Sequence, residues 1–521
     1  MTDQKKKIIW VDDEIELLKS HIIFLEERDY KITPITNAED AISLIQQQHF
    51  DLILLDEMLN GMDGLTALNK IKDISPALPV IMITKSEEET IMEEAIGGKI
   101  DDYLTKPVNP SQILLSLKKI LEGTKIESEH LSRGYVQKFN EITRRLMNSL
   151  EPEDWIDIYL NLTEWEVELD KHAELGLRQT MLDQKRECNV EFGKFIERNY
   201  QNWLESEKRP VLSTDLIAHY VIPLLSQGEN IIFVVIDNLR LDQWLGMEPL
   251  LYPFYRISKS YYFSILPTAT PYSRNAIFSG LFPYELSQSY KELWSKGEED
   301  ETSQNRYEHQ LLAYQIERYG NLRQFDQSLK YIKILEQNEA KNLYKNAATY
   351  AKAPLLAVVI NFIDFLAHSR SDSEVLKEIA PDEAAFRSLT RSWFEHSMLL
   401  KILKRLSKTS NTIFITSDHG SIRSLRGAKV LGDRETSTNL RYKFGRSLKC
   451  DSKFAIDIKN PVDFMLPPRG INTNYLIAKE DYYFVYPTDY HHYLNYYKDS
   501  FQHGGVSMEE MILPIIKLEA K

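Results

Sequence analysis

The first 122 residues repeat one pattern five times, in which a short apolar segment precedes an amphipathic helical stretch. The apolar segments read KKIIWV, YKITPI, DLILLD, PVIMIT and DDYLTK. Strands that alternate with helices in this way form a parallel sheet with helices on both of its faces. Ligands bind to such sheets beyond the carboxyl ends of the strands. The side chains at those ends are therefore expected to meet in one crevice.

Acids, a threonine and a lysine occupy the carboxyl ends of four of these strands. Asp12 and Asp13 follow the first strand, Asp56 and Thr84 end the third and the fourth, and Lys106 follows the fifth. Three carboxylates in one crevice repel one another unless a cation and the lysine ammonium neutralise them, and hard oxygen ligands favour Mg²⁺. Any one of these acids could be only a solvated strand cap, but five suitable residues at the right ends indicate a site.

The same segments resemble the receiver domain of bacterial response regulators. The resemblance rests on VDDE, LLDEMLNGMDG, MIT and DDYLTKP and covers residues 1–122. It implies a flavodoxin-like fold in which Asp56 is the phosphoacceptor. It also implies one magnesium ion, held by Asp12, Asp13, Asp56 and the backbone carbonyl of Met58.

Further positions bear on the receiver switch. By the resemblance, Thr84 and Lys106 contact the phosphoryl oxygens, and Tyr103 matches the aromatic switch position. Lys106-Pro107 resembles a Lys-Pro bond that is usually cis in the family. Asn60 departs from the pattern, since many receivers have proline there, and this departure concerns the rigidity of the loop and not the chemistry.

Residues 123–207 are predicted to form a helical bundle linker. Apolar residues recur at helical spacing, as in Trp155, Ile158, Tyr159 and Leu162, and no strand pattern interrupts them. Three helices of roughly 20 to 30 residues fit, with Pro152 in the first turn of the second. We interpret the aromatic stripes as core packing. The stretch TEWEVELDKHAEL is acidic where a DNA-recognition helix is basic.

From residue 208 the strand and helix pattern returns, with acidic and hydroxyl side chains near strand ends. The uncharged segment NIIFVVID is typical of a strand buried in a parallel sheet, and it ends at Asp237. In YYFSILPTATPYSRNAIFSG a strand precedes a helix, and Pro271 suits the first helical position. Thr270 then lies at or next to the N-cap, where free N–H groups and the helix dipole stabilise an anion. A threonine there is more often a cap, and it becomes a nucleophile only if a metal lowers its pKa.

Three later segments add candidate metal ligands. The strand LLAVVI leads to Asp364 and His368, and their spacing of four residues places both side chains on one face of a helix. Asp418 and His419 end the strand segment NTIFITSDH, and His503 lies beside two glycines before the last apolar strand. Aspartate and histidine ligands without cysteine favour zinc, with manganese as the alternative.

In this order the segments resemble the alkaline phosphatase superfamily, in the form of the PglZ domain, over residues 208–521. The resemblance implies two zinc ions. One would be held by Asp237, Thr270, Asp418 and His419, and the other by Asp364, His368 and His503. Thr270 would be the catalytic nucleophile, and phosphoryl transfer would pass through a threonine ester that water hydrolyses. A sulfatase of the same superfamily would need cysteine or serine at that position.

Residues 280–352 are predicted to form a helical cap insert, and they are rich in tyrosine. Aromatic faces above a metal site can stack nucleobases with little demand on base sequence. Packing within and between amphipathic helices is at least as good an interpretation for any single tyrosine.

The composition and charge of the chain limit the kinds of partner that it can bind. The 521 residues, 43% hydrophobic and 27% charged, are typical of a soluble globular protein. A net charge of −14 argues against a large DNA footprint, which needs clustered lysine and arginine. The longest apolar run, PLLAVVINFI, is too short to insert across a membrane. We therefore expect a cytoplasmic protein, in which Cys188 and Cys450 are ordinary thiols.

The domain order of receiver, helical linker and PglZ domain resembles response regulators of the type IX secretion pathway. This resemblance implies phosphorylation by a sensor histidine kinase and a homodimer when phosphorylated. It also implies a zinc-dependent phosphodiesterase as output, acting on cyclic or linear oligonucleotides.

Three hypotheses of function stay open. In the first, phosphorylation of Asp56 controls a phosphodiesterase through Thr84 and Tyr103. In the second, the metal domain is structural, and the chain is a signalling adaptor that binds a sigma factor or a secretion component; replacing Thr270 by alanine would then spare partner binding. The third, direct binding to DNA, is disfavoured by the charge.

Overall fold

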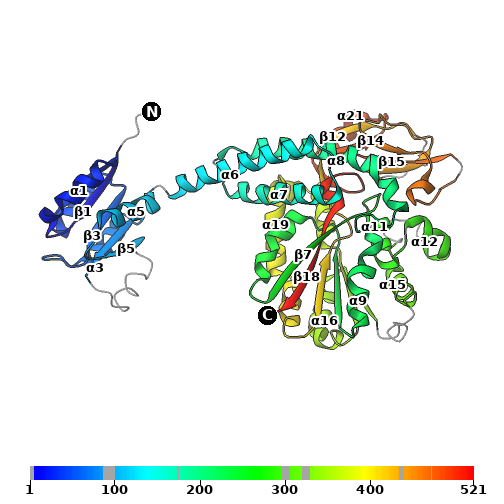
Figure 1. Ribbon diagram of the computed structural model, residues 1–521, viewed down its shortest axis with the longest axis horizontal. Helices are drawn as coiled ribbons and strands as arrows, with labels where there is room; N and C mark the ends of the chain where they lie inside the picture. The colour runs from blue at the N-terminus through cyan, green and yellow to red at the C-terminus, as the bar shows by residue number, and fades with distance from the viewer. Residues whose placement is uncertain are drawn as a thin grey trace. The chain divides into compact units, whose positions relative to one another are not determined.

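The computed structural model describes residues 5–85, 100–121, 123–172, 175–295, 305–319, 329–432, 439–470 and 472–521. The chain divides into two compact units, Met1–Gly134 and Tyr135–Lys521 (Figure 1). Each unit has a central sheet and hydrophobic clusters of its own. The boundaries 1–122, 123–207 and 208–521 stay predictions.

The first unit is built on a five-stranded parallel sheet with strand order β2-β1-β3-β4-β5, as the strand and helix alternation predicted. Its strands are β1 (Lys6–Val11), β2 (Tyr30–Ile35), β3 (Leu52–Asp56), β4 (Val80–Thr84) and β5 (Asp102–Thr105). Its helices include α1 (Lys19–Glu26), α2 (Ala38–Gln47), α3 (Gly64–Ile74) and α5 (Pro110–Leu121).

Alternating side chains of β1 enter two separate cores, one on each face of this sheet. Ile9 and Val11 belong to one hydrophobic cluster, and Ile8 and Trp10 belong to the other. The reason is the two-residue period of a strand, which sends successive side chains to opposite faces. The sheet is therefore covered on both sides, and its carboxyl edge stays open for chemistry.

Three long helices follow, α6 (Gly123–Leu146), α7 (Pro152–Lys171) and α8 (Arg178–Glu205), in agreement with the helical linker predicted from the periodicity. Pro152 is the first residue of α7, which Glu151 and Asp154 begin with a capping box. The aromatic stripes are core, as interpreted: Trp155 is buried, and Phe192 of α8 stacks on Phe263.

The sheet of the second unit is mixed, with strand order β7-β18-β10-β6-β9-β8. Its strands are β6 (Ile231–Ile236), β7 (Tyr255–Phe263), β8 (Lys330–Ile334), β9 (Leu355–Ile360), β10 (Thr412–Thr416) and β18 (Ile512–Ala520). The strands β10, β6, β9 and β8 are mutually parallel, whereas β18 is antiparallel to both β10 and β7. β7 therefore runs in the same direction as β10, and β18 begins at the edge where the others end.

Helices cover both faces of this sheet. Phe233 of β6 belongs to the cluster that includes α8 and α11 (Thr270–Ser279), and Val234 belongs to the cluster on the other face. That second face is packed by α10 (Leu241–Met247), α16 (Gln337–Tyr350), α19 (Glu383–His396) and α20 (Met398–Leu406). The remaining α-helices described are α9 (Ile222–Ser226), α12 (Pro283–Ser289), α13 (Lys291–Ser295), α15 (Glu308–Glu317), α17 (Phe362–Asp372), α18 (Glu374–Ile379), α21 (Tyr490–Tyr497) and α22 (Met508–Met511).

Among the described residues of the second unit, three small sheets lie outside the central one. They pair β11 (Ile422–Ser424) with β17 (Ser500–Gln502), β12 (Arg426–Lys429) with β16 (Tyr482–Val485), and β13 (Tyr442–Arg446) and β14 (Ala455–Ile458) with β15 (Thr473–Ala478). The first of these pairs places β17 beside the segment that follows β10, and His503 comes directly after β17.

The predicted cap insert, residues 280–352, is described only in part, because residues 296–304 and 320–328 lie outside the described residues. It contains helices, as expected, but also β8, which pairs with β9 at the edge of the central sheet. The segment KYIKI contains Lys330 and Lys333 among apolar residues, and lysines suit a strand with a neighbour on only one side. Its α16 packs against α20.

A buried network of charged side chains joins the helices α7 and α8 to the rest of the second unit. Lys185 of α8 lies 2.9 Å from Glu166 of α7 and 3.0 Å from Glu509 of α22. Arg387 of α19 lies 2.7 Å from Glu166 and 2.8 Å from Asp242 of α10. All five side chains are nearly fully buried, so each charge depends on its partners.

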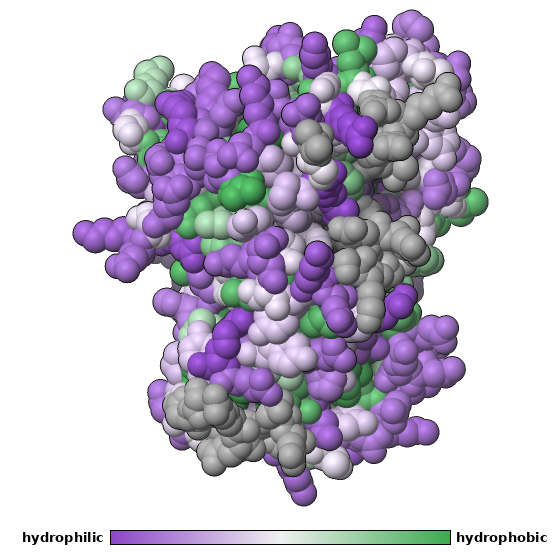
Figure 2. Space-filling view, turned by 90° about the vertical axis from the view of Figure 1, so that its right-hand side faces the viewer, coloured by the Kyte–Doolittle hydropathy of each residue, from purple (hydrophilic) through white to green (hydrophobic). Residues whose placement is uncertain are grey.

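The face shown in Figure 2 is mostly hydrophilic, with hydrophobic residues in small separate patches. Exposed large apolar side chains include Leu335, Phe362 and Phe365. Single exposed apolar residues are common, and they indicate a binding site only where they gather. In the described parts of the chain, no helix is both long and apolar enough to cross a bilayer.

Candidate functional site

The first unit brings its strand-end acids together as predicted. Asp12 follows β1 and Asp56 ends the neighbouring β3, and both carboxylates are buried. One ligand oxygen each of Asp12, Asp13 and Asp56 lies within 4.8 Å of the others. Lys106 donates from Nζ to Asp12 Oδ2 at 2.9 Å and to Asp56 Oδ2 at 2.6 Å. The crevice thus combines three acids with one ammonium.

Burial is the largest influence on the charges of this crevice. It raises the pKa of Asp56, and the neighbouring charge of Asp12 adds to that effect, although Lys106 opposes it. Burial opposes the charged form of Lys106, but its bonds to Asp56 and Asp12 raise the pKa of Lys106 above its usual value. The three acids of the crevice carry more negative charge than Lys106 neutralises, and a divalent cation can neutralise the rest. Carboxylate oxygens fit magnesium.

The other predicted receiver residues surround these acids. Thr84 ends β4 and donates its hydroxyl to the carboxylate of Glu57. The backbone N–H of Met58 donates to Asp56 Oδ1 at 3.3 Å. The side-chain amide of Asn60, the residue that departs from the receiver pattern, donates to Asp13 Oδ2 at 2.7 Å. The loop after β3 is therefore tied to the acids by two hydrogen bonds.

Two features concern positions that the receiver resemblance names, and their role in a switch stays a prediction. The bond between Lys106 and Pro107 is cis. Tyr103 of β5 has 40% of its side chain exposed.

The second unit contains a fully buried cluster at the carboxyl edge of its sheet. Asp237 follows β6, and Asp418 and His419 follow the adjacent parallel strand β10. All three side chains are 0% exposed, and one ligand atom of each lies within 4.8 Å of the others. Thr270, the first residue of α11, places its Oγ1 2.9 Å from His419 Nε2 and 3.4 Å from Asp237 Oδ1.

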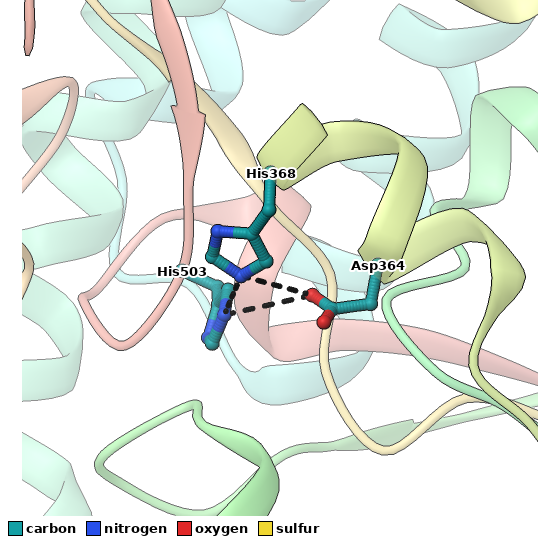
Figure 3. Close-up of side chains that lie close together, drawn as sticks. All are labelled: Asp364, His368 and His503. Carbon is teal, nitrogen blue, oxygen red and sulfur yellow. Dashed lines mark hydrogen bonds and ion pairs between the residues drawn. The ribbon is translucent and has the colours of Figure 1, made fainter. Parts of the chain in front are cut away.

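A second cluster lies nearer the surface (Figure 3). Asp364 and His368 are one helical turn apart on α17, and His503 follows β17. His368 Nε2 lies 3.4 Å from Asp364 Oδ1 and 3.4 Å from His503 Nε2, and His503 Nε2 lies 3.7 Å from Asp364 Oδ1. Half of the His368 side chain is exposed, so this cluster is open to a ligand.

The two clusters adjoin one another. The rings of His419 and His503 are stacked with centroids 4.2 Å apart. Asn238 links the acids: its side-chain amide donates to Asp364 Oδ1 at 3.1 Å, and its backbone N–H lies 3.4 Å from Asp418 Oδ1. Asn238 has φ of 63°, a left-handed conformation that asparagine tolerates better than most residues. The turn after β6 therefore serves both clusters.

The donor atoms fit cations. Within the described residues Asp418 Oδ2 is buried and has no hydrogen-bond partner. His419 Nδ1 lies 3.1 Å from the carbonyl of Gly420, so that its proton is held there and Nε2 faces Asp237 and Thr270 as an acceptor. The Nε2 atoms of His368 and His503 face each other, and both are near the carboxylate of Asp364. Aspartate and histidine sets of this kind favour zinc or manganese.

Burial sets the protonation of these side chains in the absence of a cation. It raises the pKa of Asp237 to about 7 and the pKa of Asp418 to about 6, and for Asp237 the neighbouring Asp418 adds to the effect. Burial also lowers the pKa of His419 and of His503. The histidines are therefore neutral near pH 7, as metal ligands must be.

Three families match successive parts of the chain. The BREX system PglZ alkaline phosphatase-like domain matches residues 216–518, which is more than half of the chain. The chain belongs to the PglZ family. The response regulator receiver domain matches residues 8–118, and the PorX response regulator linker domain matches residues 125–204. Together the three matches make the chain a PorX-like response regulator with a PglZ output domain.

Two curated relatives match 22% and 23% of the chain. The transcriptional regulatory protein ResD of Bacillus subtilis is 35% identical over 115 residues, 22% of this chain and 48% of ResD. SrrA of Staphylococcus aureus is 33% identical over 118 residues, 23% of this chain and 48% of SrrA. The chain thus spans about half the length of the curated relatives it matches. A receiver domain implies a histidine kinase as partner.

Solved receivers are similar over the same part of the chain. A CheY-like receiver of Methanospirillum hungatei is 30% identical and covers 23% of this chain and 98% of its own, with a TM-score of 0.22. A second solved structure is the receiver of sensor histidine kinase PA1611 from Pseudomonas aeruginosa, which has a magnesium ion in its active site cleft. It is 22% identical, with a TM-score of 0.21, and covers 22% of this chain and 98% of its own.

In the PglZ domain, the structure brings together all seven residues predicted as ligands or nucleophile, but their roles stay predictions. Three further residues of the site were not predicted. Asn238 links the clusters, and Arg274 donates to Asp237 Oδ2 at 2.6 Å and to Glu308 Oε1 at 2.5 Å. Arg274 lies four residues after Thr270, so helical spacing was the one signal that could have found it.

Gly420 explains how the buried cluster of the PglZ domain fits beside α22. A Cβ atom at this position would lie 2.0 Å from the backbone oxygen of Glu509. The N–H of Gly420 donates to the carbonyl of Glu510 at 3.2 Å. Only glycine allows this close approach, which fixes the segment directly after His419.

Proposed function

We propose that the PglZ domain is a zinc-dependent phosphodiesterase and that phosphorylation of Asp56 in the receiver controls it. The observation that supports this best is the position of Thr270. Its hydroxyl lies at the amino end of α11, 2.9 Å from His419 Nε2, and it faces the buried acids beside a second, more open cluster. A nucleophile for phosphoryl transfer needs this combination of an activated hydroxyl and neutralising charge.

The donor sets favour two zinc ions. One would be held by Asp237, Thr270, Asp418 and His419, and the other by Asp364, His368 and His503. When bound, such ions lower the pKa of a hydroxyl or water and neutralise the charge of the phosphate.

The chain's own groups would carry the reaction as follows. Thr270 Oγ1 forms a bond to phosphorus while the bond to the first alcohol breaks, and that alcohol leaves with a proton. The backbone N–H of Thr270 and the helix dipole of α11 would stabilise the phosphoryl oxygens. Arg274 holds Asp237 in place. Water then attacks phosphorus from the opposite side, releases Thr270 and gives a monoester product.

The substrates proposed are cyclic or linear oligonucleotides, and the setting proposed is regulation of type IX secretion. In the receiver, one magnesium ion would be held by Asp12, Asp13, Asp56 and the carbonyl of Met58. A sensor histidine kinase would phosphorylate Asp56, and Thr84 and Tyr103 would pass the change to a dimer surface. The support is the acidic crevice and the matches to a receiver and a PorX-type linker.

The test is hydrolysis of bis(p-nitrophenyl) phosphate and of a panel of cyclic and linear dinucleotides by the full chain. The protein is stripped with a chelator and then reloaded with zinc, manganese or magnesium. We expect the activity to disappear on chelation and to return with zinc. Activity that survives chelation, or no activity in the zinc-loaded protein, would contradict the proposal and favour the adaptor hypothesis.

A further inference from the structure

A cavity of about 680 Å³ opens beside the outer cluster of the PglZ domain. Asp364 and His368 belong to its lining. A molecule in the cavity is therefore next to the atoms at which the proposed phosphoryl transfer takes place. Its volume lies within the roughly 300 to 1,000 Å³ that small-molecule sites have. The cavity can hold the part of a substrate that extends away from the reacting phosphorus.

Aromatic side chains form one wall of this cavity. Phe362 of α17 and Trp393 of α19 are stacked, with ring centroids 4.4 Å apart and planes 5° from parallel. Phe365, also on α17, is 69% exposed and lines the cavity, and so does Leu335, which is 64% exposed. Large apolar side chains that stay exposed and gather at one cavity mark a binding site.

The charged residues of the lining are two lysines and two acids, and the lysines are the groups that an anion can approach. Lys341 of α16 and Lys401 of α20 line the cavity, and Glu336 is the one acid that joins Asp364 there within the described residues. A ligand that fits is flat and aromatic in one part and negatively charged in another. A nucleotide has both parts, because its base can stack on aromatic rings and its phosphates can approach the lysines and the metal ligands.

We propose that this cavity binds the nucleobase next to the scissile phosphate, with Trp393 and Phe362 as its stacking surface. This inference rests on the proposed phosphodiesterase function. The helix α17 then has two tasks, since it carries both Asp364 and His368 of the outer cluster and Phe362 of the stacking pair. Selection of nucleotides over simple diesters follows from Trp393 and Phe362.

The test compares two diesters with the same leaving group, thymidine 5′-(p-nitrophenyl phosphate) and methyl p-nitrophenyl phosphate, in the zinc-loaded full chain. The quantity measured is the ratio of their kcat/KM values. In Trp393→Leu this ratio is expected to fall about 5- to 150-fold, the effect of removing one stacking partner of a base. Trp393→Phe should restore most of it. Tyr493→Leu, which removes an exposed aromatic ring outside the cavity, is the matched control and should keep the ratio of the wild type.

A partial loss of folded enzyme lowers both kcat/KM values equally, so the ratio separates stacking from stability. A ratio in Trp393→Leu within twofold of the wild type overturns the inference, as does a wild type that does not prefer the nucleotide ester. If Trp393→Leu does not fold, Phe362→Leu is judged by the same ratio.

A second measurement separates failure of this inference from failure of the proposed function. A dinucleotide is titrated calorimetrically into Thr270→Ala, which needs no turnover. If the wild type hydrolyses neither ester, the proposed function fails. Binding that Trp393→Leu then weakens 5- to 150-fold still supports the base site. No binding, or binding that this substitution leaves unchanged, overturns it.

Discussion

Arg274 and the buried acids around it determine the charge of the PglZ site. Its guanidinium is 1% exposed, donates to Asp237 and Glu308, and lies 3.7 Å from Asp418. Lys333 lies 3.6 Å from Glu308 as well. Glu308 thus neutralises part of the positive charge of both Arg274 and Lys333. The pair Asp237 and Asp418 therefore keeps a net negative charge. Buried charge of this kind is stable only with a further partner, which a cation supplies.

The affinity of the PglZ site for zinc should depend on pH. Burial raises the pKa of Asp237 to about 7 and that of Asp418 to about 6, so that protons compete with the metal below these values. We expect zinc affinity to fall as the pH is lowered from 8 to about 5.5, and binding at pH 6.5 to release protons. Calorimetric titrations in buffers of different ionisation enthalpy measure both effects.

The variant Asp418→Asn is the control, because it removes one of the titrating carboxyls and should reduce the number of protons released. Zinc affinity that does not change between pH 8 and 6, without release of protons, would contradict the role of these acids.

The ligand candidates could be predicted from sequence because each stands where a simple rule places it. Asp237 and Asp418 end apolar strands, and Asp364 and His368 have helical spacing. Arg274 has helical spacing from Thr270, but spacing alone does not indicate that its side chain is buried in the site. A single arginine on a helix is usually at the surface, and only the packing of the folded chain shows that this one is buried.

At the scale of elements, the direction of β18 explains why residues from the end of the chain reach the site. The strand β18 is antiparallel to β10 and to β7, so it begins at the edge where β10 ends. His503 comes shortly before β18 and therefore arrives at the same edge as Asp418. The apolar pattern predicted this last strand but not its direction, since the pairing of distant strands leaves no mark in local sequence.

The charged network between α7, α8 and the PglZ domain should be essential for stability. In Lys185→Met, Glu166 and Glu509 lose a buried ammonium at 2.9 and 3.0 Å, and we expect the free energy of unfolding to fall by about 3 to 5 kcal/mol. Denaturant unfolding of the full chain, followed by tryptophan fluorescence, measures this change.

The matched control is Lys194→Met on the same helix. Its ammonium is paired with Glu191, but 51% of the Lys194 side chain is exposed, so the expected loss is at most about 1 kcal/mol. Equal losses in the two variants would show that the buried network has no special part in joining α8 to the domain.

Acid should weaken the same network. Burial favours the neutral form of Glu166, but Lys185 and Arg387 outweigh it and lower the pKa of Glu166 to about 2. The stabilisation that Glu166 gives is therefore complete above its unfolded pKa of about 4.5 and is lost as the pH falls toward 2. Glu166→Gln should be less stable at neutral pH and should lose less further stability between pH 5 and 2.5. An identical acid dependence in the two proteins would contradict this assignment.

At the scale of the whole molecule, one chain carries an acidic crevice and two clusters of aspartate and histidine in two separate compact units. The sequence allowed both folds to be predicted, because the strand rhythm and the strand-end residues are local patterns. It did not reveal β8 at the edge of the second sheet, since a strand of five residues that includes two lysines resembles a surface segment.

Beryllofluoride, which takes the place of a phosphoryl group on receiver aspartates, should change the diesterase rate of the full chain. A coupling of ordinary size predicts a change of about 5- to 150-fold together with formation of a dimer. Asp56→Asn should show neither effect. Light scattering and the hydrolysis assay are run on the same samples, and equal rates and masses with and without beryllofluoride would contradict control by the receiver.

The most direct test of the central claim is zinc-dependent hydrolysis of bis(p-nitrophenyl) phosphate by the wild type, Thr270→Ala and Thr270→Ser. If Thr270 is the nucleophile, its replacement by alanine lowers kcat by at least about 10³-fold, and serine, which keeps the hydroxyl, retains part of the activity. Metal content measured on the same samples shows whether the site is still loaded. A Thr270→Ala variant that binds zinc and keeps its rate within tenfold of the wild type would contradict the account.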